Sequence, residues 1–254
     1  MDWLRERLSP RDWAVIRDVM RLRLMTSRQL ERVHFADLTP PSRAVVRRRV
    51  LGRLVDWQVL RTLERRIGGV RAGSAGLVFA PDRAAWRLLE GAGNGAHRPK
   101  SLPGERYVAH TLDVAAVYAG LVEQARAGGV EVVHFEGEPG SWWPDGRGGV
   151  LKPDAYAVVA TATYEDRWWI EVDRATESLP TLRRKVTGYL EFVRQGAAGP
   201  DGVIPRVLIT VPNEKRYSDV VRLIRQLPSP AESLFIVTLH KDAAFTVMRY
   251  LQSG

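Results

Sequence analysis

Three carboxylate residues stand beside two apolar segments that have the length and composition of β-strands. Asp154 comes just before the apolar run at residues 155–161, Glu171 lies in the aromatic-rich run at residues 167–172, and Asp173 follows that run. A polar break separates the two runs, so we expect them to pair as a hairpin. The start of the first strand then lies beside the end of the second, and alternation along a strand places Glu171 and Asp173 on one face. The sequence therefore predicts three carboxylates at one end of a sheet.

Carboxylates that lie this close repel one another and raise each other's pKa unless a cation lies among them. A hard divalent ion such as Mg²⁺, bound through a few carboxylates and several waters, would neutralise them. Its ligands would be Asp154, Glu171 and Asp173. Alternatively, Arg174 and Lys185 supply the positive charge in a buried network of ion pairs. Both interpretations stay open, because structural ion-pair networks gather charges in the same way.

A helix is predicted after the hairpin, and it carries two more candidate residues. Its apolar residues recur at helical spacing and form a stripe that faces the core: Leu179, Leu182, Val186, Leu190 and Val193. Lys185 and Tyr189 lie one turn apart at the edge of this stripe. We therefore expect the Lys185 side chain to point toward the carboxylates.

Five short motifs occupy this part of the chain: Pro153-Asp154, Glu171-Val172-Asp173, Thr176-Glu177, Lys185 and Tyr189. Together they resemble the pattern of the replication-relaxation family of plasmids and other mobile elements. That family is similar to the PD-(D/E)xK nuclease superfamily and has an N-terminal winged helix. The resemblance covers nearly the whole chain and is most specific at residues 152–192.

The resemblance implies a nuclease-like catalytic site. Asp154 and Glu171 would be Mg²⁺ ligands, and Asp173 would be a third ligand or a base beside the metal. Lys185 would face the scissile phosphate or the attacking water, and Tyr189 would orient Lys185. The bound metal would stabilise charge on the phosphate and lower the pKa of that water.

Position 173 departs from the nuclease pattern. Asp173 stands where the (D/E)xK motif has a lysine, so it adds a negative charge beside any bound phosphate. Lys185 on the following helix would replace that lysine, as a migrated lysine does in some members of the superfamily. Lys152 is a second candidate for the same role.

The net charge of +9 comes entirely from the first third of the chain. Residues 1–90 contain 19 Lys+Arg against 10 Asp+Glu, whereas residues 91–254 contain 19 of each. Such asymmetry indicates a part that binds a polyanion joined to a neutral part. The chain has no cysteine, no apolar run of membrane-spanning length and no apolar core of a signal peptide near its start. We expect a cytoplasmic protein that does not enter the membrane.

The basic first third has the signals of a winged helix-turn-helix domain. Ser9 and Pro10 have the residue types that begin a helix. The predicted elements are helices at residues 10–25, 27–35, 43–57 and 81–90, and strands at residues 59–67 and 77–80. A glycine-rich tip joins the two strands, as in the wing of such a domain.

The third predicted helix is the candidate for insertion into a DNA groove. Val46, Val50 and Leu54 recur every four residues and form its inward side, so Arg48 and Arg49 lie roughly opposite. Arginine forks bind phosphates and guanine edges. The candidate DNA-binding residues are Arg43, Arg47, Arg48, Arg49 and Arg53 of this helix, and Arg65, Arg66 and Arg71 of the hairpin.

The expected fold class is α/β with two domains. Residues 1–92 form the winged helix, the Gly- and Pro-rich residues 93–104 form a linker, and residues 105–254 form a restriction-endonuclease-like domain with a mixed sheet. Further elements expected in the second domain are helices at residues 110–127 and 217–227 and strands at residues 130–136, 207–211 and 234–239.

Two classes of function follow. One is a double-stranded-DNA-binding protein of a plasmid or mobile element that acts in replication or relaxation as a Mg²⁺-dependent nickase. The other is a non-enzymatic transcription regulator or initiator accessory whose nuclease-like domain is a scaffold. Replication or mobilisation proteins are candidate partners, and a homodimer is a candidate assembly. A covalent mechanism through Tyr189 ranks third, because no basic cluster surrounds it in the sequence.

Overall fold

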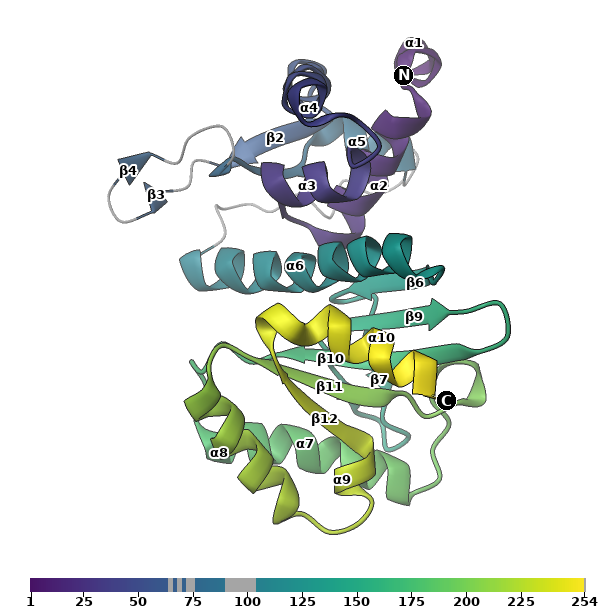
Figure 1. Ribbon diagram of the computed structural model, residues 1–254, viewed down its shortest axis with the longest axis vertical. Helices are drawn as coiled ribbons and strands as arrows, with labels where there is room; N and C mark the ends of the chain where they lie inside the picture. Colours follow the sequence, from purple (N-terminus) through teal and green to yellow (C-terminus); the bar gives the residue numbers. More distant parts are fainter. Residues whose placement is uncertain (64–65, 68–69, 72–75, 90–103, 254) are drawn as a thin grey trace. The chain divides into compact units, whose positions relative to one another are not determined.

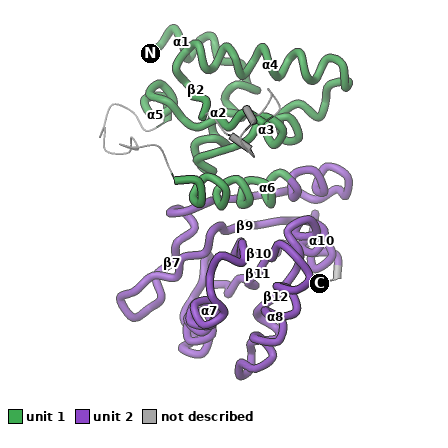
Figure 2. The backbone as a smooth tube through the Cα atoms, turned by 90° about the vertical axis from the view of Figure 1, so that its left-hand side faces the viewer, with its two compact units in different colours: residues 1–119 green, residues 120–254 purple. Residues whose placement is uncertain are grey.

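The computed structural model describes residues 1–63, 66–67, 70–71, 76–89 and 104–253. The chain divides into two compact units, residues 1–119 and residues 120–254 (Figure 2). The division falls inside one long helix, α6 (Glu105–Gly128). The predicted linker lies outside the described residues except for its last residue, and the predicted domain limits stay a prediction.

The first unit combines short helices with a small antiparallel sheet (Figure 1). Its elements are α1 (Asp2–Arg7), α2 (Pro10–Leu22), β1 (Met25–Thr26), α3 (Ser27–His34), α4 (Pro40–Asp56), β2 (Leu60–Leu63), β3 (Arg66–Ile67), β4 (Val70–Arg71), β5 (Val78–Pro81), α5 (Arg83–Leu89) and the first part of α6. The strand order in its main sheet is β1-β5-β2, and β3 pairs with β4.

Capping residues determine where the helices of this unit begin. The Ser9 side chain accepts a hydrogen bond from the Asp12 backbone, and the Asp12 carboxylate accepts one of 2.8 Å from the Ser9 backbone. Thr26 and Gln29 form the same reciprocal pair at the start of α3. Each pair satisfies two backbone donors that a helix start leaves open. Helix α4 begins at Pro40, earlier than predicted, because proline is tolerated in a first turn.

A buried carboxylate links α2, α3 and the first part of α6. Asp18 is almost fully buried and accepts a hydrogen bond of 2.9 Å from the Tyr118 hydroxyl. Arg21 and His34 lie 2.6 Å and 2.9 Å from its two oxygens. Burial raises the pKa of Asp18, but these partners lower it further, so the net shift is downward. The charged form of Asp18 is therefore the one this unit stabilises.

The second unit is built on a five-stranded mixed sheet with the order β12-β11-β10-β9-β6. The strands are β6 (Glu131–Gly137), β9 (Ala155–Ala160), β10 (Glu165–Val172), β11 (Arg206–Val211) and β12 (Phe235–Leu239). The last three run parallel, and β9 is antiparallel to both of its neighbours. The predicted hairpin of β9 and β10 and the mixed α/β class are confirmed.

Helices cover both faces of this sheet (Figure 1). One face packs on α7 (Leu179–Arg194), α8 (Glu214–Arg225) and α9 (Ala231–Leu234), around the buried rings of Trp169, Tyr189 and Phe192. Helix α10 (Ala243–Ser253) lies on the other face, where the Thr246 hydroxyl is 2.9 Å from that of Thr238. Between β6 and β9 lies a small hairpin in which strand β7 (Trp143–Pro144) pairs with β8 (Val150–Leu151).

Candidate functional site

The ends of three strands bring three carboxylate residues to one edge of the large sheet. Ala155 is opposite Ile170 of β10 on one side and opposite Gly137 of β6 on the other. Asp154 therefore precedes β9 at the position where Glu171 continues β10, and Glu138 follows β6 at the same edge. This strand register places Asp154 next to Glu171, as the sequence predicts.

Lys185 of α7 points toward these carboxylates as predicted, and Tyr189 contacts Glu171 instead of Lys185. The Lys185 ammonium forms an ion pair with Glu171 Oε2 and lies 3.9 Å from Asp154 Oδ1. The Tyr189 hydroxyl donates a hydrogen bond of 2.5 Å to Glu171 Oε1. The remaining Asp154 oxygen, Oδ2, accepts a hydrogen bond of 2.7 Å from the backbone of Val172. Four of the predicted site residues are thus in direct contact.

Burial controls the protonation of this group. Glu171 is only 2% exposed, and burial raises its pKa to about 8; Lys185 opposes that shift and Asp154 adds to it. Burial lowers the pKa of Lys185, but the attraction of Glu171 and Asp154 outweighs it, so the net shift is upward. Burial and Glu171 raise the pKa of Tyr189 well above its usual value. Lys185 therefore stays charged and Tyr189 stays a hydrogen-bond donor near neutral pH.

Asp173 has different contacts from those predicted. Its Oδ2 accepts a hydrogen bond of 2.6 Å from Arg216 Nε, and its Oδ1 accepts one of 2.7 Å from the Ala175 backbone. The same guanidinium donates to the Glu177 carbonyl at 2.9 Å. The Asp173 backbone donates a hydrogen bond of 2.9 Å to the Thr210 carbonyl of β11. Its carboxylate meets Arg216 of α8, a helix in the same core cluster as α7, so its cation comes from α8 and not from Arg174 or Lys185.

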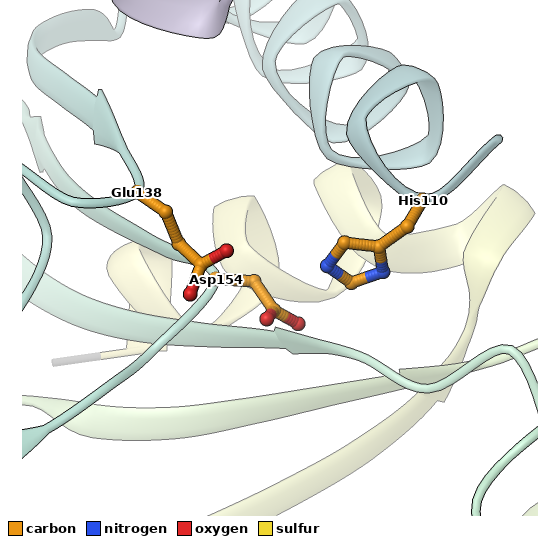
Figure 3. Close-up of side chains that lie close together, drawn as sticks. All are labelled: His110, Glu138 and Asp154. Atoms are coloured by element: carbon orange, nitrogen blue, oxygen red, sulfur yellow. The ribbon is translucent and has the colours of Figure 1, made fainter. Parts of the chain in front are cut away.

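Glu138 was not among the predicted residues. One of its carboxylate oxygens lies within 4.8 Å of one from Asp154, and Figure 3 shows both side chains. His110, also labelled there, belongs to the first unit. The sequence predicts a strand that ends just before Glu138, but no pattern in it shows that this strand is the neighbour of β9.

The exposed face of α4 carries two of the predicted DNA-binding arginines. Arg48 and Arg49 are exposed, and Val45, one turn earlier, is 59% exposed. Gly52 continues the same face one turn later and has open space where a side chain would be. Residues three and four apart lie on one side of a helix, so these form a continuous surface.

Three other predicted arginines make contacts inside the first unit. Arg43 donates to the carbonyls of Ala36 and Leu38, which lie just before α4. Arg47 is buried and forms an ion pair with Glu31 of α3. Arg53 donates to both oxygens of Asp12 of α2 at 2.7 Å. These contacts hold α4 against its neighbours.

Two of the three arginines predicted on the hairpin lie in its paired strands. Arg66 and Arg71 are opposite each other in the pairing of β3 with β4. Arg65 lies outside the described residues. The hairpin thus brings two of the three predicted basic positions together along its backbone.

The family model described as replication-relaxation matches residues 16–207, which is more than half of the chain. The chain belongs to the replication-relaxation family. This membership supports a role in replication or relaxation of a plasmid or mobile element. No curated protein and no solved structure matches the chain.

The part of the chain that matches the replication-relaxation family includes both the candidate DNA-binding residues and the candidate carboxylate site. Helix α4 and the edge with Asp154, Glu171 and Lys185 all lie within residues 16–207. Among the described residues, no helix is long and apolar enough to cross a membrane.

Proposed function

We propose that this member of the replication-relaxation family binds double-stranded DNA through a winged helix in its first unit. The order of elements supports this: a helix, a short strand, two helices, and then two strands that enclose a hairpin. The sheet order β1-β5-β2 places the last strand between the other two, as in winged-helix domains. The excess positive charge of residues 1–90 favours a polyanionic ligand.

The exposed face of α4 is the observation that carries this proposal. Within the described part of the chain, Arg48 and Arg49 are exposed and make no contact that fixes the helix, whereas Arg43, Arg47 and Arg53 anchor it. The two exposed guanidinium groups suit phosphates or guanine edges, and Val45 suits a thymine methyl group. Gly52 has no side chain, so nothing at this position keeps the helix away from a DNA groove.

The second unit is proposed to act on the bound DNA as a metal-dependent nickase. Asp154 and Glu138 offer carboxylate oxygens within 4.8 Å of each other, which are the ligands that Mg²⁺ prefers, so these two residues fit the ion. Glu171 as a further ligand would have to leave Lys185 and Tyr189. When bound, the ion would stabilise negative charge on a phosphate and activate water. Lys185 would contribute its charge to the same phosphate, and Tyr189 holds Glu171 in a fixed orientation. Asp173 as a further ligand would have to leave Arg216.

A second candidate is a non-enzymatic regulator or initiator accessory that keeps this edge as a scaffold. The observation in its favour is that the carboxylates already have partners: Lys185 faces Asp154 and Glu171, and Arg216 holds Asp173. In such a group the basic side chains offset the repulsion of the carboxylates without a metal. For either candidate, replication or mobilisation proteins are the proposed partners, with a homodimer as the proposed DNA-binding form.

DNA binding is tested by the affinity of the full chain for duplex DNA over a range of salt concentrations. The double variant Arg48→Ala/Arg49→Ala should bind more weakly, with a salt slope smaller by about two, since each lost phosphate contact removes about one. The double variant Arg222→Ala/Arg225→Ala removes the same charge from the exposed surface of α8 and is the matched control. Equal losses in both variants would contradict a specific role for α4.

Nicking is tested on a supercoiled plasmid that carries the origin of the native element, with Mg²⁺ or Mn²⁺. The nickase proposal expects open-circular product from the wild type and none from Asp154→Asn or Glu171→Gln. Nicking that persists in both variants would rule out this site. DNA binding without nicking by the wild type favours the scaffold.

A further inference from the structure

The loop after β6 places an exposed tryptophan beside the carboxylate edge. Trp142 is 38% exposed, and its Nε1 donates a hydrogen bond of 3.1 Å to Glu138 Oε1. Glu138 in turn lies within 4.8 Å of Asp154. Its hydrogen bond to Glu138 therefore holds the indole ring next to the carboxylates that are proposed to act on DNA.

The loop itself is held against the segment that leads into β9. The Ser141 hydroxyl is buried and donates a hydrogen bond of 2.6 Å to the Pro153 carbonyl, directly before Asp154. The Trp142 backbone donates to the Pro139 carbonyl at 3.1 Å, which closes a turn. These bonds keep Trp142 at a constant place relative to Asp154, as a binding surface requires.

A cation accompanies the exposed ring. Lys152 is exposed, and its Nζ lies 4.5 Å from the centroid of the Trp142 ring. A lysine stacked on a ring keeps its N–H donors available for an anion. The loop thus offers an aromatic surface and a positive charge side by side, next to carboxylates that suit a metal.

The neighbouring tryptophan, Trp143, has different surroundings from Trp142. Trp143 points its Nε1 to the Ala198 carbonyl at 2.9 Å and packs against the core of the second unit. Its role is structural. Trp142 lies outside that core cluster, and its contacts are with the polar groups of Glu138 and Lys152.

We propose that Trp142 and Lys152 form a subsite for an unpaired nucleotide of a DNA strand, with the base stacked on the indole and a phosphate on the ammonium. An aromatic ring and a neighbouring cation are the two elements that proteins use to hold single strands without base specificity. A base inside a duplex has both faces covered by its neighbours, so only an unpaired base has a face to stack. This inference rests on the proposed function. If the carboxylate edge nicks DNA, the subsite would hold an unpaired nucleotide of the DNA strand that lies next to that edge.

The test measures binding of the full chain to an unstructured single-stranded oligonucleotide and, separately, to a duplex of equal length. Trp142→Ala should weaken single-strand binding by about fivefold or more, which is the range for loss of one stacked base. Trp142→Phe keeps a ring for stacking and should restore most of the affinity. Trp3→Ala removes another exposed tryptophan that has an arginine over its ring, and it should leave single-strand binding unchanged.

Fluorescence gives a second readout. The single strand should quench the tryptophan emission of the wild type, and Trp142→Phe should lose that part of the quenching while it still binds. Single-strand affinity that is equal in Trp142→Ala and wild type, or no single-strand binding by the wild type, overturns the subsite.

Failure of the subsite is distinguishable from failure of the proposed function. If Arg48→Ala/Arg49→Ala loses duplex affinity while Trp142→Ala keeps single-strand affinity, only the subsite is wrong. If the wild type binds the single strand in a Trp142-dependent way but does not bind the duplex, the duplex-binding winged helix is wrong and the subsite stands.

Discussion

The Tyr189 hydroxyl of α7 donates a 2.5 Å hydrogen bond to the buried carboxyl group of Glu171 in β10. At 2.5 Å this bond lies at the short end of the range for O–H···O hydrogen bonds. It connects a helix to the sheet at the edge where Lys185 and Asp154 also meet. The orientation of Glu171 therefore depends on two residues of one helix.

Replacement of Tyr189 by phenylalanine should destabilise the protein by about 1–3 kcal/mol, because it leaves a buried acceptor without its donor. Equilibrium unfolding in denaturant measures the change. Tyr164→Phe removes a hydroxyl from an exposed tyrosine and should change stability by less than about 0.5 kcal/mol. A loss in Tyr189→Phe no larger than in this control would contradict the importance of the bond.

Stability should fall as the pH rises from about 5 to about 8.5, because Glu171 has a raised pKa of about 8 in the folded protein. Between the unfolded and folded pKa values the folded state binds more protons, so raising the pH favours unfolding. Glu171→Gln cannot titrate and should show a flatter profile. The measurement is the denaturant midpoint of both proteins across this range, and parallel profiles would refute the assignment.

Replacement of Lys185 by methionine should destabilise the protein by about 2 kcal/mol, since Asp154 and Glu171 lose their cation. This value is below that of a fully buried pair because Lys185 is one-third exposed. Mn²⁺ should raise the melting temperature of this variant if the carboxylates bind metal. Lys215→Met, at an exposed position on α8, is the control and should show neither effect.

Replacement of Arg216 by either alanine or lysine should destabilise the turn after β10. One guanidinium serves both Asp173 and the Glu177 carbonyl, and a lysine ammonium does not reproduce that fork. We expect a loss of about 1–3 kcal/mol in both variants. Arg222→Ala, whose ion pair is exposed, should lose less than about 0.5 kcal/mol. Full recovery of stability in Arg216→Lys would show that charge alone matters.

Alanine substitutions should divide the arginines of α4 into those that stabilise the fold and those that bind DNA. Arg47→Ala should lower thermal stability, because it leaves Glu31 without its ion-pair partner at a mostly buried position. Arg48→Ala should leave the melting temperature unchanged and lower only duplex affinity, because Arg48 is exposed. A common loss of stability in both variants would contradict this division.

Local patterns were enough to predict the hairpin, the helix after it and the approach of Lys185 to Asp154 and Glu171. Strand pairing of β9 with β10 follows from two apolar runs and a polar break, and helical spacing turns Lys185 toward the carboxylates. These are short-range relationships, which periodicity determines. The bond of Tyr189 to Glu171 was not predicted.

Long-range pairings account for what the sequence left open. Glu138 joins Asp154 because β6 is the neighbour of β9, and Arg216 reaches Asp173 because β10 and β11 are parallel. The spacing of apolar residues along the sequence does not show which strands are adjacent in the sheet. Likewise, the partners Asp12 and Glu31 of the α4 arginines come from other helices, so helical spacing alone did not separate anchoring from exposed arginines.

The hydrogen bond from the Val172 backbone to Asp154 has a consequence for the evolution of this family. Ala155, the first residue of β9, pairs with Ile170 of β10, and the Asp154 carboxylate before it accepts the hydrogen bond of the Val172 backbone beyond this pairing. Asp154 therefore contributes to folding whether or not the protein cuts DNA. A relative that does not cut DNA would still lose stability on substitution of this residue. An aspartate at this position is therefore not by itself a sign of nuclease activity.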